Sequence, residues 1–274
     1  RIALRAVPAI LYGQGVQTAP DVVSILDIPL TNITMAEAVS RIVSHASQGV
    51  HTHVCFVNAD CVNIACRRPA YLDILQHAEC VLADGIGVKL AGTILQCDIK
   101  QNVNGTDLFP RLCAAMEGTP LRLFLLGARE GVADSVAEWI AANHPGVVVC
   151  GVHHGYFSTE EETDVLRRIA QTRPDIILVA FGAPRQDIWL AEHLEDTGAS
   201  VGMGVGGLFD FYSGRIPRAP MWMREIGMEW LFRFLQEPRR MWRRYFVGNA
   251  VFLGRVIIRK LFGSSSPSHA TDDH

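Results

Sequence analysis

From about residue 53, the chain alternates short, continuous apolar runs with longer helical patterns. The apolar runs predict six strands, at residues 53–60, 79–84, 121–128, 147–152, 175–182 and 199–207. Strands that are apolar on both faces are typical of a parallel sheet covered by helices. Clear helical patterns lie between them at 131–145, 160–174 and 184–198. The sequence therefore predicts an α/β fold with an open, mainly parallel, doubly wound (Rossmann-like) sheet.

The flanking segments divide the chain into four parts. Residues 27–49 predict a small leading β–α unit, with Thr31 or Asn32 placed before its helix. After residue 214 the pattern is helical, with no further strand. We expect an N-terminal extension, an α/β catalytic domain, a helical basic and aromatic appendage and a disordered tail. Their boundaries are 1–24, 25–214, 215–262 and 263–274.

Composition narrows the class of protein. The 274 residues are 49% hydrophobic and 19% charged, which suits a globular protein with a sizeable core. The net charge of -3 gives no sign of nucleic-acid binding. Seven cysteines without a C-x-x-C pair favour buried free thiols in a reducing cytosol over disulfides or a zinc site. No run approaches the ~18 apolar residues of a spanning helix, and Pro8 argues against a signal peptide.

Polar residues follow the predicted strands, where open α/β sheets bind ligands. The candidates for substrate binding are Asn58, Asp60, Gly85, Asn104, Thr106, Asp107, Gly182, Arg185, Gly204, Gly206, Gly207 and Asp210. Two of these loops are glycine-rich and precede a predicted helix start, where backbone N–H groups and the helix dipole favour an anion. The alternative is that these glycines only make tight turns. Several such loops on one sheet edge favour a nucleotide pocket.

Asp84 and Gln186 are the catalytic candidates. A carboxylate that leaves a buried apolar strand is partly desolvated, which raises its pKa toward the range useful for a general base. The alternative role of Asp84 is to cap the helix that starts at Gly85, and Asp60 and Asp107 share that alternative. Gln186 cannot titrate. It either hydrogen bonds a sugar hydroxyl or a leaving phosphate, or lies exposed on the first turn of its helix.

The sequence predicts no metal site. His153 and His154 have no partner at ligand spacing, so a solvated loop is the preferred interpretation. No Asp-x-Asp occurs in the folded region, although sugar-nucleotide enzymes that hold their diphosphate through a metal usually need such a pair. Side-chain cations are therefore expected to neutralise a bound diphosphate.

Those cations gather near the C-terminus. Residues 233–260 contain eight basic residues and one acid, a net charge of +7, so the rest of the chain carries -3 minus 7, or -10. Aromatic residues are interleaved with them. This combination suits an anionic membrane surface, where each arginine contributes ~1 kcal/mol and rings lodge at the interface. The alternatives are a helix packed on the core with a solvated basic face, or a nucleic-acid surface, for which no motif is present.

The residues that carry these features resemble the WecG/TagA/CpsF glycosyltransferase family over roughly residues 25–245. The matching motifs are N-A-D at 58–60, D-G-I-G at 84–87, N-G-T-D at 104–107, F-L-L-G at 124–127, G-Y-F at 155–157, F-G-A-P-R-Q-D at 181–187, G-V-G-G-L-F-D-F at 204–211, R-A-P at 218–220 and E-W-L-F-R-F-L-Q-E-P-R-R at 229–240. The sequence departs from the family at Phe56, where some members carry Thr. It also has P-R-Q-D at 184–187 in place of the usual P-K-Q-E.

The resemblance implies an inverting, metal-independent transferase without a cofactor. It would move a hexose or N-acetylhexosamine, of the glucose or N-acetylmannosamine type, from a UDP-sugar to a sugar on a polyprenyl diphosphate. The pathway would be cell-wall or exopolysaccharide synthesis, on the inner face of the cytoplasmic membrane. Asp84 would be the base, Gln186 would assist it, and Gly127 would join the substrate-binding loops. The cations expected to hold the diphosphate at the membrane are Arg218, Arg233, Arg239, Arg240 and Arg243.

Two other functions fit parts of the sequence. A nucleotide-dependent oxidoreductase would use a Rossmann-like sheet, but no G-x-G-x-x-G follows an early strand. The Gly204 cluster comes late and lacks a clear following helix. A peripheral membrane scaffold would explain the basic tail but leaves the polar loop residues without a purpose. The sequence leaves open which sugar is transferred and whether the protein is a monomer or a homo-oligomer.

Overall fold

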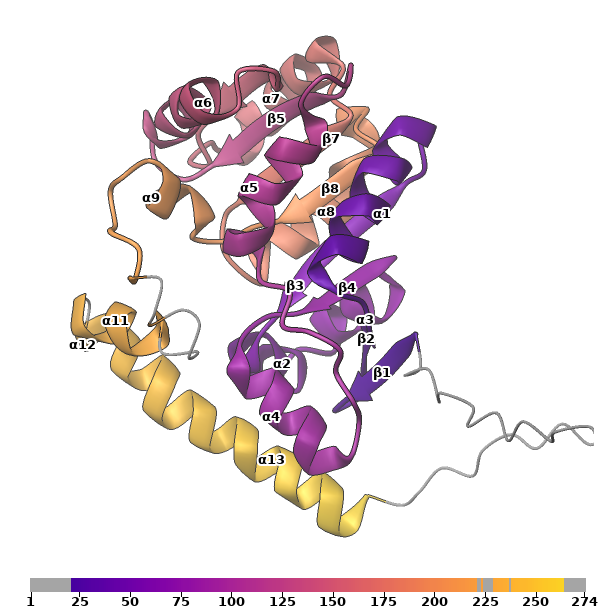
Figure 1. Cartoon of the computed structure of the whole chain (residues 1–274), viewed down its shortest axis with the longest axis vertical. Helices are drawn as coiled ribbons and strands as arrows, with labels where there is room; N and C mark the ends of the chain where they lie inside the picture. The colour runs from indigo at the N-terminus through magenta and orange to yellow at the C-terminus, as the bar shows by residue number, and fades with distance from the viewer. Residues whose placement is uncertain (1–20, 221–222, 224–228, 237, 264–274) are drawn as a thin grey trace, which may run out of the picture.

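The computed structural model describes residues 21–220, 223, 229–236 and 238–263 (Figure 1). Its main sheet has six strands in the order β4-β3-β8-β7-β5-β6, and every adjacent pair is parallel. The strands are β3 (Thr52–Val57), β4 (Cys80–Ala83), β5 (Arg122–Gly127), β6 (Val148–His153), β7 (Ile176–Ala180) and β8 (Val201–Gly204). All six lie within or overlap the runs that the sequence predicts, and the predicted fold class is confirmed.

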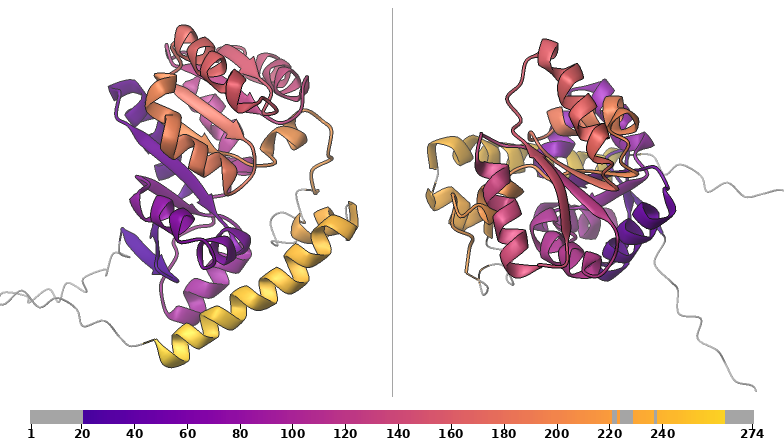
Figure 2. Two further views of the ribbon diagram at one scale, coloured as in Figure 1. Left: turned by 180° about the vertical axis from the view of Figure 1, so that it is seen from behind. Right: turned by 90° about the horizontal axis from the view of Figure 1, so that it is seen from above.

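Helices cover both faces of this sheet (Figure 2). Leu123 and Leu125 of β5 pack with α1 (Met35–Gln48), α5 (Gly105–Met116) and α6 (Val132–Asn143). Phe124 and Leu126 point to the opposite face, where they pack with other helices. Those helices are α7 (Thr159–Thr172) and α8 (Arg185–Thr197). Because successive side chains of a strand alternate between faces, a run that is apolar at every position supplies both cores.

The leading unit is a β-hairpin followed by a helix. Strands β1 (Val22–Ile25) and β2 (Ile28–Thr31) pair antiparallel before α1. The predicted cap at Thr31 or Asn32 is wrong, because Thr34 caps α1 in a capping box with Glu37. Thr31 ends β2 instead. The buried Asn32 side chain accepts from the amide of residue 100 and donates to the carbonyl of residue 98, which holds the loop before α5.

Three short helices surround the β3–β4 end of the sheet. They are α2 (Ala59–Ala65), α3 (Pro69–His77) and α4 (Ile86–Leu95). Their buried side chains form a separate core with the hairpin and with the inner face of β3 and β4. The two helices α2 and α4 begin directly after the two strands β3 and β4, so the position of each helix is coupled to the end of its strand.

The C-terminal segment is helical from residue 229. After a short α9 (Leu208–Tyr212), the helices are α11 (Glu229–Gln236), α12 (Pro238–Trp242), the π-helical η1 (Arg243–Gly248) and α13 (Asn249–Phe262). The expectation that helix begins at residue 215 is wrong for 215–220, because Pro217 and Pro220 disfavour it. Among the described residues, no helix combines the length and the apolar character needed to cross a bilayer. Residues 1–20 of the expected extension (1–24) and residues 264–274 of the expected tail (263–274) lie outside the described residues. The boundary at residue 24 is wrong, because it divides β1.

Helix α13 packs on the body of the protein (Figures 1 and 2). Phe252 and Val256 are 1% and 0% exposed, and they join the core that α2 and α4 form. The buried Asn63 of α2 donates to the carbonyl of Gly248 at 2.7 Å and accepts from Nη1 of Arg255 at 2.8 Å. The end of the helix is pinned by an ion pair between Arg259 and Asp27 of the hairpin. This part of the predicted appendage is therefore packed into the core.

All seven cysteines are free, as the sequence predicts. Four are buried, at positions 55, 61, 80 and 113. Cys97 and Cys150 are half-buried, and Cys66 is exposed. The expectation of buried thiols therefore holds for most of them but not for Cys66.

Two valines of α13 allow the docking of this helix to be tested. Val256→Ala should lower the free energy of unfolding by about 2 kcal/mol, because two buried methyl groups are lost and a cavity remains. Val251, which is 44% exposed on the same helix, is the matched control, and its alanine variant should stay within about 0.5 kcal/mol of the wild type. Urea unfolding measures both. Equal stabilities of the two variants would contradict the docked position of α13.

Candidate active site

Asn58 and Asp84 follow neighbouring parallel strands at the same edge of the sheet. Val57 of β3 is in register with Ala83 of β4, so the next residues on each strand lie side by side. The amide of Asp84 donates to the carbonyl of Val57 at 2.9 Å. Asn58 caps α2, with its side-chain oxygen accepting from the amides of Asp60 and residue 61. The sheet thus brings the half-buried residue Asp84 next to Asn58, the N-cap of α2.

The turn at Asp84 is fixed by a residue that the sequence analysis did not identify. Oδ1 of Asn102 accepts from the amide of Gly85 at 2.6 Å, and the amide of Val103 donates to the carbonyl of Ala83 at 2.8 Å. Residues 102 and 103 therefore lie against the end of β4 and hold the turn at Asp84 and Gly85 in place. Nothing in the local sequence distinguishes Asn102 from an ordinary turn residue, because its partner lies 17 positions away.

Gln186 joins the loops that follow β7 and β8. Its Oε1 accepts from the amide of Gly182 at 3.1 Å and from the amide of Gly206 at 2.8 Å. The side chain is only 4% exposed, so the alternative of an exposed position on the first turn of α8 is wrong. One of the glycine amides expected to meet a phosphate, that of Gly206, is engaged by Gln186. The side chain thus acts as a brace between two of the predicted substrate-binding loops.

A second network ties the start of α5 to the chain after α9. Asn104 caps α5 and donates to Asp107 at 2.8 Å, and Asp107 forms an ion pair with Arg218. The hydroxyl group of Tyr212 donates to the carbonyl of Thr106 at 2.7 Å. Arg218, which the sequence predicts to meet a diphosphate, therefore anchors residues 210–220 beside the loop that precedes α5.

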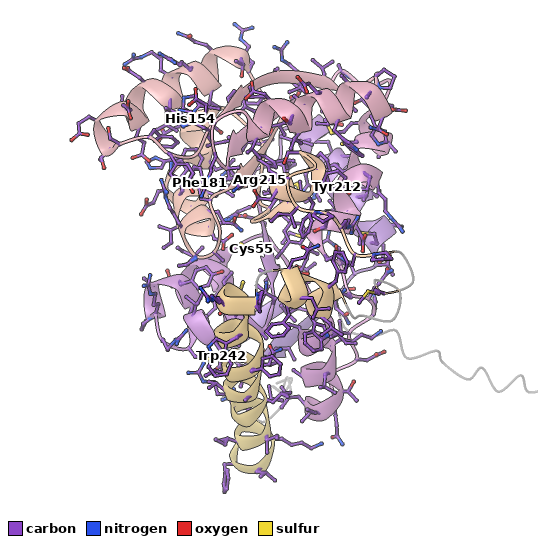
Figure 3. The ribbon with its side chains drawn as sticks, turned by 90° about the vertical axis from the view of Figure 1, so that its left-hand side faces the viewer. Cys55, His154, Phe181, Tyr212, Arg215 and Trp242 are labelled. Carbon is purple, nitrogen blue, oxygen red and sulfur yellow. The ribbon has the colours of Figure 1, made fainter. Side chains whose placement is uncertain are left out.

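The strand-end loops thus converge at one edge of the sheet, and the C-terminal helices lie on the same side. Figure 3 shows Phe181, Arg215 and Tyr212 above Cys55, with Trp242 of the C-terminal helices below it.

Comparison of the sequence with protein-family models gives a match over residues 23–266 to the glycosyl transferase WecG/TagA/CpsF family. The chain belongs to this glycosyltransferase family.

Two relatives of this glycosyltransferase are N-acetylglucosaminyldiphosphoundecaprenol N-acetyl-beta-D-mannosaminyltransferases. The protein from Bacillus subtilis (strain 168) is 29% identical over 222 residues, which cover 81% of this chain and 86% of the relative. The protein from Staphylococcus aureus (strain MW2) is 31% identical over 223 residues, which cover 81% of this chain and 87% of the relative. The resemblance deduced from the motifs is confirmed.

The other predicted residues of the glycosyltransferase have varied surroundings. Gly127 has a φ of 134°, and a Cβ on it would lie 2.7 Å from the backbone nitrogen of Ala180. Both the backbone conformation and the packing therefore require glycine here, whether or not a substrate binds. Arg185 is exposed and lies over the ring of Phe181, with Cζ 4.7 Å from the centroid. Asp210 pairs with Arg215 at 3.1 Å.

Gly204 and Gly207 flank the Gly206 loop, and Arg239 is exposed on α12. The side chains of Arg233, Arg240 and Arg243 lie outside the described residues.

Behind the sheet edge, the glycosyltransferase has a buried polar cluster that the sequence analysis missed. Oδ2 of Asp187 accepts from the hydroxyl group of Tyr71 at 2.8 Å, and Nε2 of His53 lies 3.4 Å from Sγ of Cys55. Burial raises the pKa of Asp187 to about 7, against the opposing effect of the hydrogen bond from Tyr71. Burial also lowers the pKa of His53 to about 4 and raises that of Cys55 well above its usual value.

The same cluster has the spacing of a metal site. One ligand atom from each of His53, Cys55 and Asp187 lies within 4.8 Å of the others, a combination found once in the described part of the chain. A closed structural zinc site has four protein ligands. This cluster supplies three, and burial drives each of them toward its neutral form. The cluster thus lacks the fourth protein ligand of a closed structural site, and Oδ1 of Asp187 is buried without a hydrogen-bond partner among the described residues.

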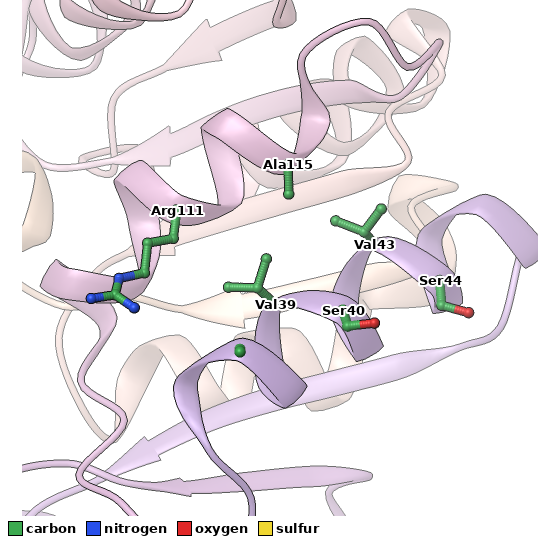
Figure 4. A pocket seen from close by; sticks show the side chains of 7 residues that line it. Val39, Ser40, Val43, Ser44, Arg111 and Ala115 are labelled. Atoms are coloured by element: carbon green, nitrogen blue, oxygen red, sulfur yellow. The ribbon is translucent and has the colours of Figure 1, made fainter.

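A groove of about 600 Å³ lies elsewhere on the surface, between α1 and α5 (Figure 4). Its apolar walls come from Val39, Val43 and Ala115, and Arg111 stands at one end. No predicted site residue lines it. A second hollow of about 370 Å³ lies beside the ends of β5 and β6, where Arg129, Glu130, His154 and Tyr156 line it. Only this second hollow is at the edge of the sheet where the loops converge.

The buried cluster has a consequence for the pH dependence of stability. The folded state keeps the proton of Asp187 up to about pH 7, whereas the unfolded chain releases it near 3.8. This contribution to stability is therefore present below pH 4 and is lost as the pH rises through 7. His53 acts in the opposite sense, because its contribution is present above about pH 6.5 and is lost as the pH falls through 4.

Asp187→Asn should reveal the opposite effects of Asp187 and His53 on the pH dependence of stability. The variant loses the contribution of Asp187 and keeps that of His53, so its stability should rise more steeply than that of the wild type between pH 4.5 and 6.5. The measurement is the free energy of unfolding in urea across that range. Parallel curves for the two proteins would show that Asp187 is already ionised in the fold.

Proposed function

We propose that this chain transfers N-acetylmannosamine or a related hexose from a UDP-sugar to a sugar carried on a polyprenyl diphosphate, in cell-wall or exopolysaccharide synthesis. The names of the two relatives support this substrate class. The observation that carries the proposal is the position of Asp84 beside Asn58, at the ends of adjacent parallel strands and next to the loops braced by Gln186.

Asp84 would serve as the general base. It would take the proton from the acceptor hydroxyl group as that oxygen attacks the anomeric carbon. The bond from that carbon to the diphosphate oxygen would break in the same step, so that UDP leaves with inversion. The backbone around Asp84 is held by Val57 and by Asn102, which fixes the point from which its side chain extends before the substrates arrive. Such preorganisation lowers the barrier because no reorganisation is needed during the reaction.

The diphosphate would be met by side-chain cations in this proposal. Arg185 is exposed at the start of α8, next to the loop of Gly182. The arginines of the C-terminal segment would complete the charge, with Arg239 on the exposed surface of α12. Arg218 is committed to Asp107, so its role would be to hold the loop rather than to meet the phosphate. If arginine side chains neutralise the diphosphate in this way, the reaction would not need a metal ion.

Asp84→Asn tests the base directly. We expect the variant to lower kcat by about 10²- to 10⁴-fold, because positioned base catalysis contributes about that much. The affinity for UDP, measured by titration calorimetry, should stay unchanged. Release of UDP from a panel of UDP-sugars with a short-chain lipid diphosphate acceptor measures turnover and identifies the donor. Undiminished turnover in the variant would remove Asp84 from the base role, and binding of NAD instead of UDP would favour the oxidoreductase.

The C-terminal helices would also hold the protein at an anionic membrane surface. Ile258, Leu261 and Phe262 of α13 are 60%, 68% and 79% exposed, beside Lys260. Trp242 and other apolar side chains of α11 to η1 are exposed as well. Apolar side chains next to basic ones bind the interface through burial and headgroup attraction. This position would bring the site to an acceptor that cannot leave the bilayer.

Two introduced negative charges test the membrane face. The double variant Ile258→Glu and Leu261→Glu should lose flotation with vesicles that contain anionic phospholipid, because each change removes buried apolar area and adds repulsion. Val148→Glu is the control, since Val148 is 44% exposed but lies on β6, away from the C-terminal helices. If the double variant floats as well as Val148→Glu, the membrane contact lies elsewhere on the protein.

A further inference from the structure

Helix α13 has two faces with different surroundings. Phe252 and Val256 are buried in the core that α2 and α4 form. Ile257 and Ile258 are 48% and 60% exposed on the outer side. The membrane proposal uses only the outer face, so the inner face needs its own explanation.

The inner face of α13 reaches a point where the first turns of α2 and α4 lie close together. Gly87 lies in the first turn of α4, and a Cβ atom placed on it would be 3.6 Å from Cβ of Ala59. The same position would be 3.9 Å from Cε1 of Phe252. Ala59 is the first residue of α2. The ring of Phe252 therefore borders the first turn of α4 and shares a core with Ala59, at the start of α2.

Those two first turns carry the proposed active site. Asn58 caps α2 and directly precedes Ala59. Gly85 is the N-cap of α4 and directly follows Asp84. Glycine has no side chain with which to cap its helix, so the position of this turn depends on packing and on the bond from Gly85 to Asn102. Movement of either first turn would change the separation between Asn58 and Asp84.

We propose that Phe252 is a positioning residue for the transfer reaction: its ring fixes the spacing between the first turns of α2 and α4, and through them the positions of Asn58 and Asp84. The inference rests on the proposed role of Asp84 as the base. Helix α13 is held in place for this task by its bonds to Asn63 and by the ion pair between Arg259 and Asp27.

Removal of the ring would leave a cavity that α2 and α4 can enter. These helices have 7 and 10 residues, so a small rigid displacement needs little rearrangement within either one. A misplacement of about 1 Å can lower a rate by about 10²-fold when reacting groups must be aligned. The loops of β7 and β8 would keep their positions, because Gln186 rather than α13 braces them.

The experiment compares Phe252→Ala with Phe124→Ala in the full-length protein. Phe124 is 3% exposed and belongs to the separate core under α7 and α8, so it is a matched control for the loss of a buried ring. Turnover is measured with the UDP-sugar found active and a short-chain acceptor in detergent, without vesicles. We expect Phe252→Ala to lower kcat by about 10- to 100-fold with the affinity for UDP unchanged, and Phe124→Ala to keep the kcat of the folded wild type.

Two further measurements separate positioning from instability. Hydrogen exchange at the amides of residues 85–88 should rise in Phe252→Ala and stay unchanged in Phe124→Ala. Phe252→Leu, which keeps most of the volume, should recover most of kcat, and it supplies the comparison if Phe252→Ala does not fold. Equal kcat in Phe252→Ala and Phe124→Ala, or wild-type kcat with faster exchange, would overturn the positioning role. If Asp84→Asn keeps the kcat of the wild type, the base role of Asp84 is overturned instead, whereas a wild-type protein that releases no UDP from any UDP-sugar would overturn the proposed function.

Discussion

Strand β3 is the element on which the rest of the structure depends. It is buried along its whole length and has a parallel neighbour on each side, β4 and β8. Parallel pairing places the carboxyl ends of all three strands at one edge, which brings Asn58, Asp84 and the loop of Gly206 to the same part of the protein. Because both faces of β3 are covered, a shift in its register would place the polar residue Asn58 inside the core. The cost of that shift fixes the geometry of the site.

Gln186 and Asp187, which are adjacent at the start of α8, have different roles. Gln186 braces the loops at the sheet edge, while Asp187 turns inward to Tyr71. Both are accommodated because Gly204 lacks a side chain. A Cβ there would collide with Oδ1 of Asp187 and lie 2.8 Å from Nε2 of Gln186. The glycine expected to admit a phosphate is thus also required by the protein's own side chains.

The sequence predicts the parts of this structure that depend on local pattern. The six strands and the long helices follow from continuous apolar runs and capping signals, and the site loops follow from the rule that ligands bind at strand ends. Asp84 and Gln186 are placed at that edge by the same reasoning. The sequence alone does not separate a catalytic role for Gln186 from the bracing role, because its partners Gly182 and Gly206 depend on the tertiary fold.

What the sequence does not predict involves pairs of residues that are far apart along the chain. Asn63 and the carbonyl of Gly248 are 185 positions apart, and Tyr71 and Asp187 are 116 apart. The basic and aromatic pattern near the C-terminus does not separate the two faces of α13. Its inner face, with Phe252 and Val256, carries no signal that distinguishes core packing from membrane contact, since both need apolar side chains.

The two faces of α13 give a reason for this arrangement. A helix of 14 residues is about 21 Å long and behaves as one rigid rod, so the inner face packed on α2 and α4 and an outer face that met the membrane, as we propose, could not move independently. An acceptor linked to a lipid reaches the enzyme at a nearly fixed height above the bilayer. A flexible tether would let that height vary, and each misaligned encounter would lose reactivity. If α13 lies at the membrane as proposed, its packing against α2 and α4, which follow Asn58 and Asp84, would remove this variation and would explain why α13 belongs to the core.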